Sequence, residues 1–468
     1  MLALTFAACV KDPEPTVIEA TGAPSELVPT VLHVAFDGEG TGFVEYGLDG
    51  FDLRTPDDAG GATHDVAVLG LKAAHAYQWR AVVVDADRVR SESEPGSFDV
   101  PAPPAELLPV TVTVADEAAE LQYFLASVIR PDLTSFAAIM DRDGDWVWWA
   151  SSDGTVMVTP ELGVDGASIA WGQYDFGKYL DIGRMVRVSL DGTTRTETRL
   201  PIGHHDFVQH DDGTVAFLGI SFAEIAIGDT TYAMASDTIS VIDEGSTAET
   251  STPIFDMFAD FPLEPEVTCD HIAHEEPKLG QDAVHEWTHG NSFMFVPEDD
   301  AYYVNDKFTD WLIKVDRATG APLWKLNGRG SEFTQPNGDP VWVDVQHTSL
   351  WSHGHMSDIW SGGGMMFDNG DHHVPTVSRA IEFAWDEAAR TAEIVWEYPH
   401  PEGLATAALG DVRRMPLGDV LITWAGLGEI TEVTRDGAIV WRAEMDGDRQ
   451  LVGRLVPITD LYDPHGTP

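Results

Sequence analysis

The sequence has 468 residues, and its 78 acidic and 27 basic side chains give a formal net charge of −51. This balance argues against binding to nucleic acid or to anionic lipid, because both depend on clustered Lys and Arg. A hydrophobic fraction of 43% with 15 Trp and 20 Phe excludes a disordered chain, and the length allows two or three domains.

The first 25 residues have the pattern of a signal remnant followed by a tether. The segment Phe6-Ala7-Ala8-Cys9 resembles a bacterial lipobox, in which the cysteine is lipidated after cleavage. We therefore expect a lipoprotein of the bacterial cell envelope, facing the periplasm or the surface and held to the membrane only by the lipid on Cys9. Cys269 would then be a free thiol without a disulfide partner. No other stretch approaches the ~18 apolar residues of a membrane span.

Residues 26–105 are predicted to form a β-sandwich. Apolar side chains alternate along short segments that are separated by turns, at residues 31–36, 42–47, 64–69 and 77–84. Leu71 and Tyr77 have the spacing of the tyrosine corner in fibronectin type III domains, so we expect a sandwich of that type. The proline-rich run at 100–105 predicts a stiff linker.

Residues 115–468 contain a loose internal repeat. An Asp/Gly turn followed by a β-rich run that ends in Trp recurs at residues 141–149, 316–324, 391–396 and 434–441, and similar turns without the Trp occur at 190–193 and 242–245. A second type of turn alternates with these at 211–218, 297–304 and 416–422. A period of about 50–60 residues favours four-stranded blades over a long sandwich or a β-helix, and predicts a six-bladed β-propeller in an all-β chain.

Histidine is the residue type that points to chemistry. The sequence lacks the phosphate-binding motifs GxxxxGK[ST] and GxGxxG and the GxSxG motif of hydrolases. Most of its 17 histidines lie in clusters at 204–205, 285–289, 347, 353–355 and 372–373. The first three clusters lie at or near the start of predicted inner strands, which line the central channel of a propeller. We therefore expect them to converge on one site.

These segments resemble, in the same order, blocks of the bacterial arylsulfate sulfotransferases. The resemblance covers residues 200–445 and rests on the segments 203–207, 211–214, 286–292, 346–348, 366–370, 378–383 and 395–398. It implies a periplasmic six-bladed propeller behind a small N-terminal β-domain. It also implies transfer of a sulfuryl group from an aryl sulfate donor to a phenolic acceptor, with no nucleotide sulfate donor, no cofactor and no metal.

The resemblance also implies roles for particular residues. His347 is similar to the histidine that becomes sulfated, and His289 with Asn291 to the His-x-Asn pair. His204 or His205 corresponds to a further active-site histidine, and Lys307 stands where the family has an anion-holding Arg. Lys lacks the planar guanidinium with which Arg binds two oxygens at once. Arg379 either has a structural role or binds the sulfuryl oxygens in place of the family's Arg.

Two other functions remain open on the sequence. One is a metal hydrolase, with Zn²⁺ or Mn²⁺ held by histidines of the pairs 285/289, 353/355 and 372/373. The other is a lipid-tethered propeller that binds a ligand or acts as a scaffold, because a fold does not determine a function. The natural donor and acceptor phenols and the oligomeric state do not follow from the sequence.

Overall fold

The computed structural model describes residues 17–151, 156–174, 183–227, 229–261, 284–344, 350–445 and 450–465. Cys9, Cys269 and His347 lie outside these ranges. The chain divides into two compact units, Met1–Pro103 and Pro104–Pro468. Within the described ranges the elements are strands, apart from α1 (Met257–Asp260) and two 3-10 turns at Pro297–Asp299 and Ala425–Leu427, so the prediction of an all-β chain is confirmed. None of the described helices is long and apolar enough to span a bilayer.

The first unit is one hydrogen-bonded sheet of eight strands. They are β1 (Val17–Ile18), β2 (Ala20–Pro24), β3 (Leu32–Gly47), β4 (Leu53–Arg54), β5 (Asp58–Val68), β6 (Ala76–Val84), β7 (Arg90–Ser93) and β8 (Gly96–Asp99). The long strand β3 pairs with β2 and β5 at one end and with β4 and β6 at the other. The segments 31–36 and 42–47, predicted as two strands, are thus parts of one strand.

A bulge at Gly40 allows β3 to continue through its glycine-rich middle without ending in a turn. The register of β3 against β5 shifts on both sides of Gly40, whose φ is +140°, and a Cβ there would lie 2.3 Å from the carbonyl oxygen of Val84. Such bulges bend a strand without ending it. The hydroxyl of Tyr77 accepts a hydrogen bond from the backbone N–H of Lys72 at 3.2 Å, the type of contact expected of a tyrosine corner. Likeness to a fibronectin type III domain stays a prediction. Strands β1 and β2 occupy part of the predicted tether.

The second unit is a β-propeller of six blades, as predicted. From the inside outward, blade 1 is β34 (Leu451–Ile458), β10 (Tyr123–Ile129), β11 (Ser135–Asp141) and β12 (Trp146–Ser151). Blade 2 is β13 (Val156–Leu162), β14 (Ser168–Tyr174), β15 (Arg184–Ser189) and β16 (Arg195–Arg199). Blade 3 is β17 (Gly203–Gln209), β18 (Thr214–Ile227), β19 (Thr230–Asp243) and β20 (Pro253–Asp256), with β21 (His285–Glu286) beside β19.

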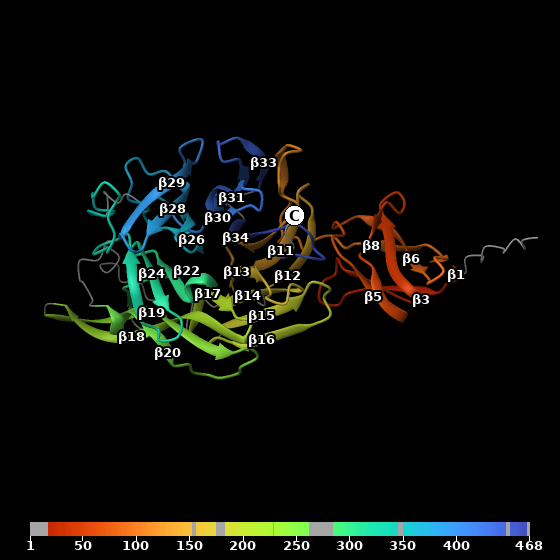
Figure 1. Cartoon of the computed structure of the whole chain (residues 1–468), viewed down its shortest axis with the longest axis horizontal. Coiled ribbons are helices and arrows are strands. Elements are labelled where there is room, and N and C mark those ends of the chain that lie inside the picture. The colour runs from red at the N-terminus through yellow and green to blue at the C-terminus, as the bar shows by residue number, and fades with distance from the viewer. Residues whose placement is uncertain are drawn as a thin grey trace, which may run out of the picture. The chain divides into compact units, whose positions relative to one another are not determined.

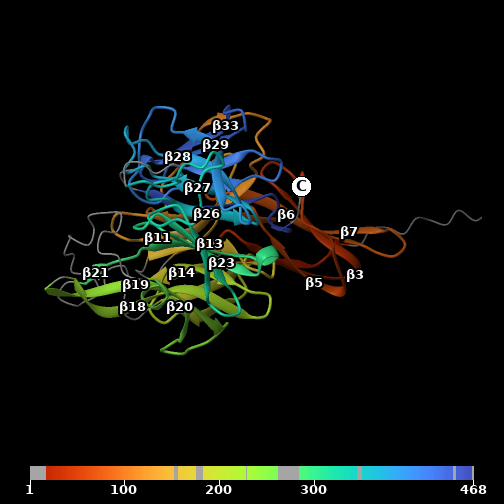
Figure 2. The same cartoon turned by 60° about the vertical axis from the view of Figure 1, so that its left-hand side comes forward.

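Blade 4 is β22 (Gly290–Val296), β23 (Ala301–Asp306), β24 (Trp311–Asp316) and β25 (Pro322–Leu326). Blade 5 is β26 (His355–Trp360), β27 (Gly363–Asp368), β28 (Arg379–Asp386) and β29 (Thr391–Pro399). Blade 6 is β30 (Asp411–Arg414), β31 (Val420–Thr423), β32 (Glu429–Val433) and β33 (Ile439–Glu444), with β9 (Thr111–Ala115) outermost. The hairpin of β18 and β19 projects beyond the other strands of its blade (Figures 1 and 2).

The ring is closed at two places by strands from opposite parts of the sequence. β34, near the C-terminus, is the inner strand of blade 1 and pairs with β10. β9, which precedes the predicted start of the propeller at residue 115, pairs with β33 of blade 6. The six inner strands contact one another in the order β34, β13, β17, β22, β26, β30 and back to β34, and they surround the middle of the propeller (Figure 1).

Tryptophans on the fourth strands of blades 1, 5 and 6 link these blades to the next. The indole N–H of Trp148 in blade 1 donates to the carbonyl oxygen of Leu190 at 3.2 Å. Trp396 in blade 5 donates to the carbonyl of Arg435 at 3.0 Å, and Trp441 in blade 6 to that of Arg142 at 2.8 Å. Each acceptor lies in the Asp/Gly turn before the fourth strand of the next blade. In these three blades the Trp and the following turn are therefore the two halves of one contact between blades.

Candidate active site in the propeller channel

The inner strands of blades 3, 4 and 5 share an irregularity at their first residues. The register shifts between Gly203 and Phe207 in β17, between Gly290 and Ser292 in β22, and between His355 and Ser357 in β26. A bulge releases residues from the ladder and turns their side chains. Because these strands are neighbours in the ring, the released residues meet at one end of the channel. They include His204, His205 and Asn291, and the shift in β26 directly follows His355, which is paired with Phe367. His289 lies just before β22.

His204 and His205 form a hydrogen-bonded pair with different surroundings. Their Nδ1 atoms lie 2.8 Å apart, and the rings of His205 and His289 lie 4.7 Å apart. His204 points away from His289, and its Nε2 faces the carboxylate of Asp237 at 3.0 Å and the carbonyl of Gly219 at 3.2 Å. His205 is therefore the member of the pair next to the other site histidines, a choice that the sequence left open.

The partners of this pair determine which ring nitrogen carries each proton. Two acceptors at Nε2 of His204 require a proton there, so in neutral His204 the Nδ1 atom is an acceptor. His205 must then donate from its own Nδ1, and its Nε2 carries the lone pair. Burial, followed by the charges of His289 and His204, lowers the pKa of His205 well below the ordinary value, which keeps it neutral at neutral pH. The backbone of His205 has a positive φ of +51°, and Thr159 donates to its carbonyl at 2.9 Å.

His289 is held from several directions. Its backbone N–H donates to Asp306 at 2.7 Å, and its Nδ1 lies 3.2 Å from a carboxylate oxygen of Glu286. Its ring stacks on Phe308 with centroids 4.8 Å apart. The next backbone N–H, that of Gly290, donates to Asp237 at 2.8 Å. Asp237 thus contacts both the His204 ring and the backbone beside His289.

Asn291 is fully buried and lies between blades 4 and 5. Its Nδ2 donates to the carbonyl of Gly354 at 2.9 Å, and its Oδ1 accepts from Asn305 at 2.7 Å. Asn305 also donates to the carbonyl of Gly354 at 2.7 Å. The two amides together fix the backbone immediately before His355. In the structure Asn291 supports the site, and its role in holding sulfuryl oxygens stays a prediction.

His355 begins β26 and is buried. Its Nδ1 lies 2.7 Å from Oδ1 of Asn369 and 3.1 Å from the carbonyl oxygen of His353. The amide nitrogen of Asn369 donates to the carbonyls of Thr406 and Leu409, which turns its oxygen toward His355. Burial and then the charge of Lys307 lower the pKa of His355 well below the ordinary value, so His355 is neutral at neutral pH.

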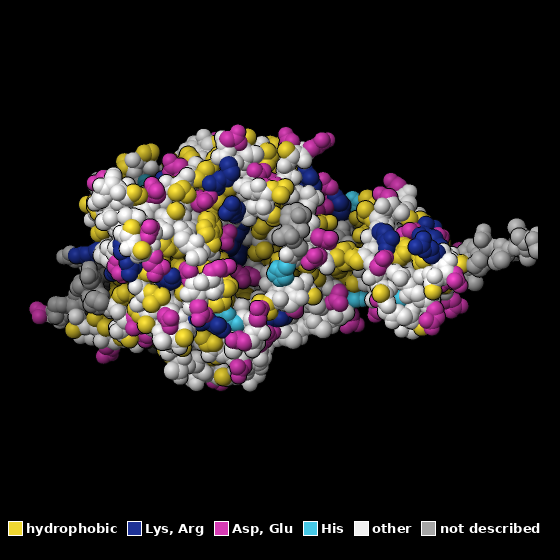
Figure 3. All heavy atoms as spheres, in the orientation of Figure 1, with side chains coloured by type: hydrophobic (Ala, Val, Ile, Leu, Met, Phe, Trp, Pro, Cys, Tyr) yellow, Lys and Arg dark blue, Asp and Glu magenta, His cyan; other side chains and the backbone are white. Residues whose placement is uncertain are grey.

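Lys307 supplies the positive charge next to the histidines. Its backbone N–H donates to the carbonyl of His289 at 3.0 Å, and its ammonium donates to the carbonyl of Ala407 at 3.3 Å. Its charge lowers the pKa of both His205 and His355, so it acts on blades 3 and 5 together. Acidic side chains, by contrast, are spread over the visible face of the propeller (Figure 3).

A small cavity lies beside these residues. Its volume is about 10 Å³, and it is lined by His204, His205, Ile220, Ala235, Ser236, Asp237, Glu286, Thr288 and His289. A cavity of this size holds about one water molecule. The histidines are therefore closely packed in the structure.

Comparison with known proteins decides the family. The model of the family described as Arylsulfotransferase (ASST) matches residues 110–448. The chain belongs to this family. Arylsulfotransferases are enzymes of the sulfotransferase kind, and the family implies an aryl sulfate donor and a phenol acceptor. A search of curated proteins finds no significant match.

Solved structures match this arylsulfotransferase only at low similarity. A protein of unknown function from Bacteroides caccae has a TM-score of 0.43 and 12% identity, and the match covers 73% of this chain and 100% of that one. The β-propeller domain of Myceliophteria thermophila Cps50 (Swd1) has a TM-score of 0.37 and 10% identity, over 71% and 89%. Virginiamycin B lyase from Staphylococcus aureus has a TM-score of 0.35 and 10% identity, over 75% and 100%. Likeness at this level says nothing about activity.

One residue expected in the arylsulfotransferase site, Arg379, is not among those brought together, and another lies outside the described residues. His347 lies outside the described residues, so its role stays a prediction. The guanidinium of Arg379 is fully hydrogen-bonded: it donates to Asp368 at 2.8 Å, to the carbonyl of Leu350 at 2.9 Å, and to Glu397. These contacts occupy all three guanidinium nitrogens and leave the cationic position to Lys307.

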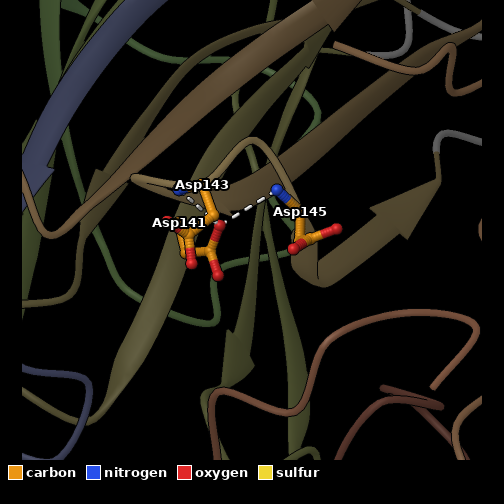
Figure 4. A group of neighbouring side chains, drawn as sticks. All are labelled: Asp141, Asp143 and Asp145. Carbon is orange, nitrogen blue, oxygen red and sulfur yellow. Dashed lines mark hydrogen bonds between the residues drawn. The ribbon is translucent and has the colours of Figure 1, made fainter. Parts of the chain in front are cut away.

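Of the histidines proposed for the alternative metal hydrolase, His353 and His372 meet, with their Nε2 atoms 3.1 Å apart, but they are not part of a group of three ligands in the part of the chain that the structure describes. The group there that brings three ligand-type atoms within 4.8 Å of one another is Asp141, Asp143 and Asp145, in the turn between β11 and β12 (Figure 4). Asp141 accepts the backbone N–H groups of Asp143 and Asp145 at 3.0 and 2.9 Å, as an aspartate that closes a turn does. This group contains no histidine.

Other residues of the channel were not found from the sequence. Arg454 of β34 is fully buried and forms ion pairs with Asp206 at 2.6 Å and with Glu161. Asp206 also accepts the backbone N–H of Phe293 at 2.8 Å. The arginine in the otherwise apolar strand β34 was the available sign, because a charge in such a run needs a buried partner.

Proposed function

We propose that this protein transfers a sulfuryl group from an aryl sulfate ester to a phenolic acceptor, without a nucleotide donor, through a covalent intermediate on a histidine. The observation that carries the proposal is the convergence of His205, His289 and His355 near the starts of three neighbouring inner strands, with Lys307 hydrogen-bonded to the backbone of His289. Family membership supports the same reaction class.

The arrangement suits the chemistry of an aryl sulfate. The sulfate ester is an anion with a good leaving group, so catalysis depends mainly on positioning and on stabilisation of charge, as in phosphoryl transfer. Lys307 provides the cation. Neutral imidazoles provide lone pairs for attack on sulfur, and His289 beside the Glu286 carboxylate is placed to exchange a proton with the phenolic oxygen.

The direct test is the release of 4-nitrophenol from 4-nitrophenyl sulfate, with and without an added phenol. We expect acceptor-dependent turnover with ping-pong kinetics. His205→Asn, which keeps a donor near the position of Nδ1 but removes Nε2, should lower kcat by about 10²–10⁴-fold, the usual contribution of a general acid or base. The control is His465→Gln, at an exposed histidine of the same propeller, which should leave kcat unchanged.

A folded protein that releases no 4-nitrophenol, with any phenol supplied, would contradict sulfotransfer and favour the ligand-binding propeller. Equal loss of activity in His205→Asn and His465→Gln would indicate a general effect on the propeller and not a site at the channel. We also propose lipidation at Cys9 and attachment to the bacterial cell envelope, supported by the lipobox-like residues 6–9; labelling with palmitate that is lost in Cys9→Ser tests this.

A further inference from the structure

We propose that His353 and His372 bind a divalent transition metal ion of the zinc or copper type, with water completing its coordination shell. His353 lies just before β26, and His372 lies in the segment that follows β27, so both belong to blade 5. The proposal goes beyond sulfotransfer, because neither residue has a part in the reaction described above. It assigns a separate task to two of the clustered histidines.

The two rings meet through their Nε2 atoms. These nitrogens lie 3.1 Å apart, and the ring planes are nearly perpendicular, at 88°. Two nitrogen lone pairs repel each other at this distance, so a proton or a metal ion has to lie between them. Two zinc–nitrogen bonds of about 2.0–2.1 Å place their nitrogens about 2.9 Å apart at a right angle and about 3.3 Å apart at the tetrahedral angle. The observed separation lies between these two values.

The carboxylate of Asp371 prepares His353 to act as a ligand. Its Oδ2 atom lies 3.0 Å from Nδ1 of His353, so the proton of the neutral ring is on Nδ1 and the lone pair is on Nε2. Metal-binding histidines usually donate their second ring N–H to a carboxylate or a carbonyl in this way. His353 is buried, and its backbone N–H donates to Asp310 at 2.6 Å. Its ligand atom is therefore fixed in the absence of metal.

Asp310 is an independent sign that a cation binds at this position. Its side chain is 1% exposed, and within the described residues its Oδ2 atom has no hydrogen-bond partner. A buried oxygen without a partner points to a bound water or ion. Burial raises the pKa of Asp310, and the carboxylates of Asp368 and Asp371 add to the rise. Arg379 neutralises Asp368 at 2.8 Å. The other two carboxylates are left to attract a divalent cation.

The ligand atoms determine the kind of metal. Imidazole nitrogen suits zinc, copper and nickel, whereas magnesium and calcium prefer oxygen ligands, and copper binds such sites more tightly than zinc. Two protein ligands leave the remaining positions to water, so binding is weaker than at a structural zinc site with four protein ligands. When the metal binds, the proton on Nε2 of His372 moves to Nδ1 of the same ring, and no oxidant or reductant is needed. The net charge of −51 raises the concentration of cations around the chain.

The test is a titration of the full chain with Cu²⁺ after removal of metal by a chelator. Excess Mg²⁺ is present to occupy the surface carboxylates, calorimetry measures the affinity, and Zn²⁺ is added as a competitor. Electron paramagnetic resonance of bound Cu²⁺ counts its nitrogen ligands. His372→Asn removes one ligand, and Asp371→Ala removes the acceptor that orients His353. The control is His465→Gln, at an exposed histidine of the same propeller. Thermal melting verifies the fold of each variant.

We expect one Cu²⁺ ion per chain, held by two nitrogens and displaced by Zn²⁺. The affinity should fall at least about tenfold in His372→Asn, which keeps one nitrogen ligand, and by about 10–100-fold in Asp371→Ala. His465→Gln should bind like the wild type. An unchanged affinity in His372→Asn, or no binding in the presence of Mg²⁺, would overturn the proposal and leave the two rings with a shared proton only. Equal weakening in His465→Gln would also overturn it, because scattered histidines would then hold the metal. Each of these results is independent of the sulfotransfer assay.

Discussion

Asp237 is the carboxylate whose replacement tests the proton arrangement of the site most directly. It accepts hydrogen bonds from Nε2 of His204 at 3.0 Å and from the backbone of Gly290 at 2.8 Å. Burial alone would raise the pKa of Asp237, but the hydrogen bonds from His204, Thr288 and Gly290 outweigh it and hold the pKa below the ordinary value. The substitution Asp237→Asn keeps the shape of the side chain and replaces one acceptor oxygen by an NH₂ donor.

The amide can satisfy only one of the two donors. If its oxygen accepts from Gly290, its NH₂ faces Nε2 of His204, which must then give up its proton. Nδ1 of His204 becomes the donor, Nδ1 of His205 the acceptor, and Nε2 of His205 becomes protonated, the wrong state for a base. The lost hydrogen bond to a charged group costs about 1.5–3 kcal/mol of stability. Loss of a general base costs about 10²–10⁴-fold in rate. A triad aspartate in serine proteases behaves in this way: its change to Asn costs about 10⁴-fold through the wrong tautomer.

The measurement pairs kcat/KM for 4-nitrophenyl sulfate with the free energy of unfolding in urea. We expect activity to fall at least a hundredfold while the protein remains folded. The control is Asp243→Asn, at an exposed aspartate of the same strand, which should change neither quantity. Full turnover in Asp237→Asn would refute the arrangement in which the amide oxygen accepts from Gly290 and the NH₂ group faces His204.

Two further predictions concern charge. Lys307→Gln should raise the pKa of His205 and of His355, since the lysine charge lowers both. The acidic limb of the profile of kcat/KM against pH should then move to higher pH, whereas Lys307→Arg should leave the limb unchanged. An unchanged limb in Lys307→Gln would contradict the placement of the cation. Asp310→Asn should stabilise the protein at alkaline pH. Burial raises the pKa of Asp310 to about 7, despite the opposing effect of His353, so the folded state loses stability as pH rises from the unfolded pKa of about 4 to about 7, by up to about 4 kcal/mol. Urea melts should show equal stability for the variant and wild type near pH 4 and a more stable variant near pH 8. Asn also tolerates the φ of +57° of residue 310. A variant that is no more stable than the wild type near pH 8 would contradict a raised pKa for Asp310.

The architecture of the propeller could be predicted because its repeat is local. Five of the six blades have an Asp/Gly turn before their fourth strand, and Trp324, Trp396 and Trp441 all lie on fourth strands. The strand boundaries of the N-terminal unit were harder to predict, because no repeat marks them. Alternation shows which residues share a face, but not that Gly40 continues β3 where a turn was expected.

The candidate site was predicted in part. Histidine clusters and their order along the chain indicate which strands meet, so His205 and His289 were expected together, and they are in contact. Which of two adjacent histidines faces the channel depends on a bulge, and bulges leave no clear mark in one sequence. His355 was grouped with possible metal ligands because its partner Asn369 and the charge of Lys307 come from distant segments.

The ion pair between Arg454 and Asp206 has a consequence for how the protein matures. Asp206 adjoins His205 in β17, whereas Arg454 lies in β34, 248 residues later in the sequence. During synthesis the strands with the catalytic candidates emerge long before the arginine that pairs with this carboxylate. A nascent chain that has not reached residue 454 would hold an unpaired carboxylate next to His205, so this end of the channel cannot be completed before β34 is made.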